Sequence, residues 1–220
     1  MSRERCHYGL RVVAIKLYST TYCPYAWRSR IVLHEKGVEF ETFEVDLRDK
    51  QEDFLEVSPR GLVPVMVHDD TTIAESMTIN EYLEEFYPEP PLMGDGPIER
   101  AAVRSAIVDL NFNRSRPLAR LASMLFYGRE KRDESVIEQQ SARWNRYLDD
   151  LEQHFSDNEW LATDKFSMAD LSLYPTELVT RIGFQLGGDR ERPALDSWRE
   201  RVQARESVQA TAPEGFGTAA

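Results

Sequence analysis

The 220-residue chain has little cysteine, only Cys6 and Cys23. Two cysteines cannot form a disulfide framework, so hydrophobic cores must supply the stability of the fold. An apolar fraction of 41%, with four Trp and ten Phe, is enough to fill such cores. We therefore expect a globular protein whose thiols stay reduced. Cys6 lies in a polar leader, and we expect it to have no role in the chemistry.

Long hydrophobic runs are also missing. No stretch approaches the roughly 18 apolar residues of a membrane span, and the first five residues lack the apolar core of a signal peptide. A net charge of -11 argues against binding to nucleic-acid phosphates, which requires a basic surface. The four His are scattered without metal-ligand spacing. We expect a cytoplasmic protein with no membrane, nucleic-acid or metal partner.

The stretch from residue 12 to residue 45 predicts a β-α-β unit. Residues 12–18 are apolar and β-branched, as in a buried strand. Residues 24–36 have a helical pattern that ends before Gly37, with Trp27, Ile31, Val32 and Leu33 expected to form an apolar stripe on one side. Residues 38–45 alternate like a second strand. Because a helix connects the two strands, we expect them to be parallel.

Cys23 lies at the predicted turn between the first strand and the first helix. Pro24 suits the first helical position, so Cys23 should be the N-cap. Its sulfur would then face free backbone amides and the positive helix end, with Arg28 and Arg30 adding positive charge. This arrangement favours the thiolate, the form that attacks disulfides and electrophilic carbons. Taken alone, the same pattern also fits a buried structural cysteine.

The next stretch predicts a second half of the same domain. Residues 50–57 suggest a short helix, residues 65–67 and 73–74 two strands, and Ser76 the cap of a helix reaching residue 87. The order is therefore β-α-β-α-β-β-α. Pro64 is poorly placed for a central strand unless it occupies a special turn.

A composition shift marks the domain boundary. Residues 88–97 are rich in Pro and Gly and have no apolar period. Only helical patterns follow, with a bend expected at Pro117 and an N-capping box at residues 167–170. The predicted helices span residues 98–127, 133–155, 168–184 and 193–206. We therefore expect an α/β domain over residues 1–88, a linker over 89–96, an all-helical domain over 97–210 and a mobile tail over 211–220.

This organisation resembles the cytosolic glutathione transferases, which join a thioredoxin-like domain to an all-helical one. The resemblance covers nearly the whole chain and rests on four motifs in the expected order. They are Cys-Pro-Tyr-Ala at residues 23–26, Gly-Leu-Val-Pro-Val at 61–65, Glu-Ser at 75–76 and Ser-Met-Ala-Asp at 167–170. The first three are most similar to the omega class and its bacterial relatives, which use cysteine where most other classes use Tyr or Ser.

The resemblance implies a glutathione site. It makes Val63–Pro64 a cis peptide that turns the Val63 backbone toward the cysteinyl part of glutathione. Glu75 and Ser76 would hold the γ-glutamyl end, whose ammonium and carboxylate need an acid and a helix N-terminus with a hydroxyl.

The same resemblance implies two further contacts and a homodimer. Lys50 would meet the glycyl carboxylate of glutathione, although a solvated surface lysine is the simpler interpretation. Tyr25 would line the pocket of the sulfur. The dimer would form through the third and fourth helices.

The leading hypothesis is a glutathione-dependent thiol transferase or reductase acting on a small glutathionylated or electrophilic substrate. Cys23 would form a mixed disulfide with glutathione, and a second glutathione would release it. Because Ala26 stands where a Cys-x-x-Cys pair has its second cysteine, an external thiol must resolve the intermediate. Two alternatives stay open. One is conjugation or ether cleavage by glutathione's own thiolate, and the other is a non-enzymatic polymerase-associated stress protein of the same fold.

Overall fold

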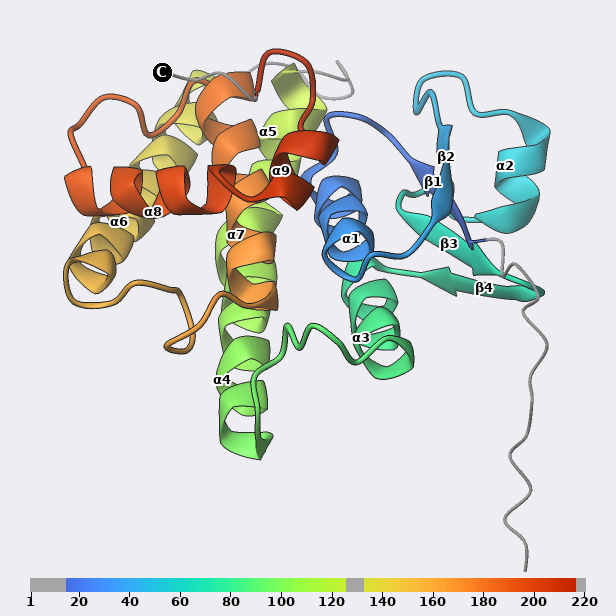
Figure 1. Cartoon of the computed structure of the whole chain (residues 1–220). Coiled ribbons are helices and arrows are strands. Elements are labelled where there is room, and N and C mark those ends of the chain that lie inside the picture. Colours follow the sequence, from blue (N-terminus) through green and yellow to red (C-terminus); the bar gives the residue numbers. More distant parts are fainter. Residues whose placement is uncertain (1–14, 126–132, 217–220) are drawn as a thin grey trace, which may run out of the picture.

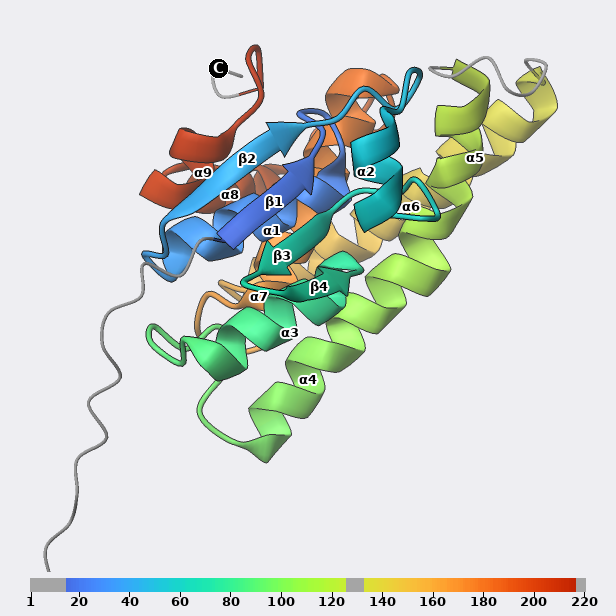
Figure 2. The same ribbon diagram turned by 90° about the vertical axis from the view of Figure 1, so that its right-hand side faces the viewer.

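The computed structural model describes residues 15–125 and 133–216 (Figure 1). Its four strands form one mixed sheet in the order β2-β1-β3-β4, seen face-on in Figure 2. β1 and β2 are parallel, whereas β3 is antiparallel to both β1 and β4. The strands are β1 (Ile15–Ser19), β2 (Phe40–Glu44), β3 (Val65–His68) and β4 (Thr71–Ala74). This topology confirms the predicted thioredoxin-like β-α-β-α-β-β-α fold class.

Three helices flank the sheet. α1 (Pro24–Glu35) and α3 (Ser76–Phe86) cover the face turned toward the remaining helices, and α2 (Glu52–Val57) covers the other face (Figure 1). α1 is buried on every side from Ala26 to Leu33, which differs from the one-sided apolar stripe expected from its sequence. The reason is its position, because α1 is packed between the sheet and α7.

The rest of the described chain is helical, which confirms the predicted all-α part of the fold. The predicted continuous helix up to residue 127 is instead interrupted by a π-helical segment, η1, just before Pro117. A proline lacks the backbone N–H that an α-helix needs at that point. Residues 126 and 127 lie outside the described part. The elements are α4 (Pro97–Val108), η1 (Asp109–Ser115), α5 (Arg116–Leu125), α6 (Glu134–Asp157), α7 (Met168–Leu178), η2 (Val179–Gly183), α8 (Pro193–Gln203) and α9 (Glu206–Thr211).

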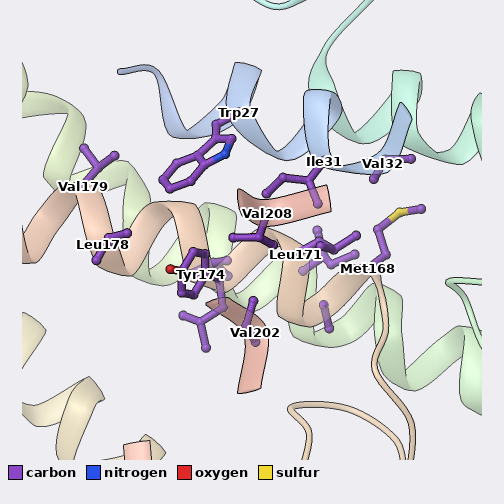
Figure 3. Packing of buried hydrophobic residues seen from close by; sticks show 14 of the residues in the cluster. Trp27, Ile31, Val32, Met168, Leu171, Tyr174, Leu178, Val179, Val202 and Val208 are labelled. Carbon is purple, nitrogen blue, oxygen red and sulfur yellow. The ribbon is translucent and has the colours of Figure 1, made fainter. Parts of the chain in front are cut away.

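The hydrophobic core joins the sheet part to the helical part through α1 and α7. Figure 3 shows Trp27, Ile31 and Val32 facing the side chains of α7. The Trp27 indole is fully buried, and its Nε1 donates a hydrogen bond to Thr211 Oγ1 at 3.0 Å. Trp27 follows Cys23 by one helical turn, so the packing of Trp27 in the core fixes the position of the cysteine turn.

The capping box predicted at the start of α7 is confirmed. The amide of Ala169 donates to Ser167 Oγ at 3.3 Å, and the amide of Ser167 donates to Asp170 Oδ2 at 3.0 Å. Asp170 is fully buried and also accepts a bond from Trp198 Nε1 on α8. The box therefore starts α7 and also ties it to α8.

The expectation of a mobile tail over residues 211–220 does not hold as far as residue 216. Thr211 is the last residue of α9, and the ring of Phe216 is buried. Its centroid lies 5.6 Å from that of Tyr22 and 6.2 Å from that of Trp27. Phe216 is surrounded in the sequence by small and polar residues, so the sequence pattern does not predict that its ring is buried.

Candidate functional site

Cys23 stands where the sequence places it, at the N-cap of α1. Its backbone is extended, Pro24 is the first helical residue, and the carbonyl of Cys23 accepts the amide of Trp27 at 2.9 Å. Cys23 is partly buried. Among the described residues, Cys23 is the only cysteine. The predicted N-cap position is therefore confirmed.

The ionisation of Cys23 differs from the expectation. Burial raises the pKa of the Cys23 thiol above its usual value. The backbone amides of Ala26 and Tyr25 and the charges of Arg28 and Arg30 act in the opposite direction without overcoming it. The expected preference for the thiolate is thus wrong for the ligand-free protein. The sequence shows the helix dipole and the arginines, but the loss of solvent arises from tertiary packing.

Arg30 braces the cysteine turn. Its guanidinium donates to Ser19 Oγ at 2.5 Å and to the carbonyl of Thr21 at 2.9 Å. Burial lowers the pKa of Arg30, and the nearby charge of Glu44 opposes that shift. Arg30 therefore joins the end of β1 to α1 and has an acidic neighbour.

Arg28 has a different environment. Its side chain is fully buried, both terminal nitrogens donate to Asn111 Oδ1 at 3.1 Å, and its guanidinium lies 4.7 Å from the centroid of the Tyr25 ring. Within the described ranges, no carboxylate lies within ion-pair distance of Arg28. Burial lowers the pKa of Arg28 to about 10, and the groups that oppose this are Tyr25 and Cys23. Arg28 thus carries a buried charge beside the cysteine.

Tyr25 links the cysteine turn to the helical part. Its side chain is half-buried, and its hydroxyl lies 3.1 Å from Ser115 Oγ on η1. The contact with Arg28 on one side and Ser115 on the other fixes the ring. Tyr25 therefore lies at the junction of α1 and η1, two residues from the sulfur.

The turn before β3 contains the expected cis peptide between Val63 and Pro64. Pro64 is buried and β3 begins at the next residue, so this proline lies outside the strand ladder. Gly61 has a left-handed backbone with φ of +60°, and a Cβ there would lie 2.8 Å from Lys50 Nζ. The half-buried Lys50 ammonium therefore lies against this turn, which disfavours the simpler interpretation of a freely solvated lysine.

Glu75 and Ser76 lie at the start of α3, one position later relative to the helix than the sequence predicts. Glu75 is the N-cap residue, and Ser76 is already the first helical residue, so the expectation that Ser76 caps the helix is wrong. Glu75 has a φ of +71°, a backbone strain that is uncommon for residues other than glycine and that concentrates at functional sites. The Glu75 carboxylate pairs with Arg60, both side chains being more than 60% exposed.

The structure also shows contacts that the sequence does not predict. Arg60, Asn111 and Ser115 touch the predicted site residues, but no motif or spacing marks them. In the described ranges no cluster of His, Cys, Asp or Glu could hold a metal ion, and no helix is long and apolar enough to cross a membrane.

Known proteins share this sequence pattern. Residues 22–85 match the family model for the N-terminal domain of glutathione S-transferase, and residues 116–206 match that for its C-terminal domain. Glutathione S-transferase 1 of Dianthus caryophyllus is 33% identical over 182 residues, covering 77% of this chain and 79% of the relative. Glutathione S-transferase omega-1 of Mus musculus is 33% identical over 162 residues, covering 73% of this chain and 65% of the relative.

Another relative and a solved structure extend this comparison. The stringent starvation protein A homolog of Haemophilus influenzae is 31% identical over 192 residues, covering 87% of this chain and 86% of the relative. The crystal structure of a glutathione S-transferase from Rhodospirillum rubrum F11 superposes with a TM-score of 0.80 at 26% identity, covering 92% of this chain and 98% of that one. The chain therefore belongs to the glutathione S-transferase family, whose members use glutathione as co-substrate, and it has omega-class proteins among its relatives.

Proposed function

We propose that this protein is a glutathione-dependent thiol transferase that works through Cys23. The observation that carries the proposal is a half-buried cysteine at the N-terminus of α1, facing two backbone amides and two arginines. These amides and arginines would stabilise the Cys23 thiolate once it forms, which suits a nucleophile more than a structural thiol, although burial raises the pKa of the thiol in the ligand-free protein. Ala26 leaves the first helical turn without a resolving cysteine, so glutathione must supply the second thiol.

The proposed reaction has two exchanges. The thiolate of Cys23 attacks the glutathione sulfur of a glutathionylated substrate, the substrate S–S bond breaks, and the substrate leaves as a thiolate that takes a proton from water. A second glutathione thiolate then attacks the mixed disulfide. It releases oxidised glutathione and restores Cys23, so the net change converts the substrate disulfide and one glutathione into the substrate thiol and oxidised glutathione.

We assign glutathione binding to residues around the cysteine. The backbone of Val63, ahead of Pro64, pairs with the cysteinyl part, and Lys50 meets the glycyl carboxylate. Glu75 and Ser76 at the start of α3 hold the γ-glutamyl end. Tyr25 lines the pocket of the sulfur, as its place between Arg28 and Ser115 supports.

The replacement Glu75→Gln is expected to weaken glutathione binding. The substitution removes the charge that would meet the ligand ammonium, and the exposed Arg60 pair costs little to open. The KM for glutathione should rise about tenfold with kcat nearly unchanged, because this end of the ligand is held equally in the ground and transition states. Initial rates over a range of glutathione concentrations measure both. Glu41→Gln, on exposed β2, is the matched control, and an equal KM for the two variants would remove Glu75 from the site.

Comparing two substrates tests the reaction class. We expect glutathione-dependent reduction of hydroxyethyl disulfide to exceed conjugation of chlorodinitrobenzene. Dominant conjugation would instead favour the alternative in which glutathione's own thiolate attacks an electrophile or cleaves an ether. The raised pKa of Cys23 in the ligand-free protein is the observation that keeps this alternative open.

A non-enzymatic role is the other alternative, and the relationship to a stringent starvation protein A homolog favours it. An adaptor has no need of a reactive thiol beside a glutathione site. Failure to bind a glutathione resin, together with co-purification of RNA polymerase, would replace our proposal with this one.

The proposal includes a homodimer in the reducing cytoplasm, formed through α3 and α4. Three large apolar side chains are exposed on these helices, Phe86, Ile98 and Val108, and Ile98 is 85% exposed. Glu81 and Arg104 pair between the two helices at 3.1 Å and hold them together. A dimer would cover these apolar side chains, and light scattering of the purified protein measures its mass.

A further inference from the structure

Two arginines are buried at the cysteine turn, and within the described part of the chain only Arg30 has an acidic neighbour, whereas Arg28 has none. Arg30 has Glu44 as an acidic neighbour, whereas both terminal nitrogens of Arg28 donate to the amide oxygen of Asn111. The Nε of Arg28 is buried and has no hydrogen-bond partner. A buried charge without an opposite charge destabilises the folded protein, so the position of Arg28 near Cys23 requires an explanation.

Asn111 comes from the helical part of the fold and holds this charge in place. It lies on η1, and its side-chain nitrogen donates to the sulfur of Met77 on α3. Ser115 lies one turn further along η1, donating to the carbonyl of Asn111 and contacting the Tyr25 hydroxyl. The irregular helix thus presents two neutral side chains to α1, and π-helical turns are frequent at functional sites.

We propose that Asn111 is a positioning residue that fixes Arg28 as the counter-charge of the Cys23 thiolate. The neutral amide oxygen of Asn111 holds the guanidinium in place by hydrogen bonds and does not neutralise its charge. The positive charge can therefore stabilise the thiolate of Cys23. Among the side chains that the structure describes, the ionisable groups around Cys23 are Arg28, Arg30 and Tyr25 on α1, and Glu44 on β2 lies near Arg30. The side chains that η1 and α3 contribute there, Asn111, Ser115 and Met77, are neutral. The inference rests on the proposed reactivity of Cys23.

The replacement Asn111→Asp tests this assignment, because it keeps the acceptor oxygens and adds a negative charge. The new carboxylate would neutralise Arg28, so less thiolate should form at Cys23. The measurement is the rate of alkylation by iodoacetamide from pH 6 to pH 11 in the ligand-free protein, fitted to one ionisation so that the fit gives both the apparent pKa and the limiting rate at high pH. At pH 7 the rate should fall about three- to tenfold, while the plateau at high pH stays within twofold. The plateau separates an electrostatic effect from a change in access to the sulfur.

The matched control is Asn113→Asp, which adds the same charge at an exposed position of η1 and should leave the pH profile unchanged. Thermal unfolding supplies the second measurement, since a carboxylate beside a buried, unpaired guanidinium should keep or raise Tm. An unchanged alkylation rate at pH 7 would overturn the assignment, as would a fall in the plateau or a Tm lowered by more than a few degrees. Because the assay contains no glutathione, these results are independent of whether the proposed transferase activity is found.

Discussion

Replacing Cys23 with alanine is expected to lower glutathione-dependent reduction of hydroxyethyl disulfide by about 10³-fold or more. The reason is chemical, because the proposed reaction passes through a covalent bond to the Cys23 sulfur and the rest of the first turn offers no other thiol. The Cys23 side chain is only half-buried and makes no side-chain capping bond, so its loss should leave the fold intact. The steady-state rate, compared with the uncatalysed rate at the same pH, is the measurement.

Two controls make the result specific to the sulfur of Cys23. Cys6→Ala removes the other thiol of the chain and should keep full activity. The Cys23→Ala protein should still bind glutathione and unfold within a few degrees of the unmodified protein. A Cys23→Ala protein that retained full disulfide reduction would show that the attacking thiol belongs to glutathione, and it would reverse our order of hypotheses.

The largest expected effect on stability comes from Glu84, a buried carboxylate on α3. It pairs with Lys36 Nζ at 2.6 Å, and the exposed fractions of the two side chains are 3% and 0%. Glu84 also accepts the backbone amides of Leu92 and Met93, while Lys36 Nζ donates to the carbonyl of Pro90. This ion pair thereby fastens the Pro-rich segment between α3 and α4 onto the end of α1, so the segment is a fixed connection.

Glu84→Gln is expected to lower the free energy of unfolding by about 3 kcal/mol, because it leaves the ammonium of Lys36 buried without its counter-charge. Adding Lys36→Met removes that charge and should recover at least about 1 kcal/mol. Urea unfolding of the two variants measures both values. Glu85→Gln is the matched control on the exposed face of α3 and should change stability by less than about 0.5 kcal/mol. A double variant as unstable as the sum of its single replacements would contradict this account.

Most of the fold could be predicted because its determinants are local. The alternation of residues 38–45, the proline after Cys23 and the capping box at Ser167 each specify an element within a few residues, and each element forms. The errors have tertiary causes. The burial of α1 on all sides and the anchoring of Phe216 depend on neighbours that are distant in the sequence.

The residues of the candidate site also divide into those that a local sequence pattern predicts and those that depend on tertiary contacts. Cys23 could be identified from its turn, and the cis peptide before Pro64 from the family resemblance. Asn111 could not, because it meets Arg28 across 83 positions of the chain with no motif to mark it. The sequence predicts a lowered pKa for Cys23, and this prediction is wrong for the same reason. The loss of solvent that raises the pKa comes from tertiary packing, which leaves no pattern in the sequence.

The central claim is that one glutathione binds covalently to Cys23 during the reaction. Mass spectrometry of the intact protein after incubation with oxidised glutathione, followed by peptide mapping, tests it most directly. Our account predicts a single glutathione adduct on the peptide that contains Cys23, removed by added reduced glutathione and absent from Cys23→Ala. An unmodified Cys23 under conditions in which the protein reduces hydroxyethyl disulfide would contradict it.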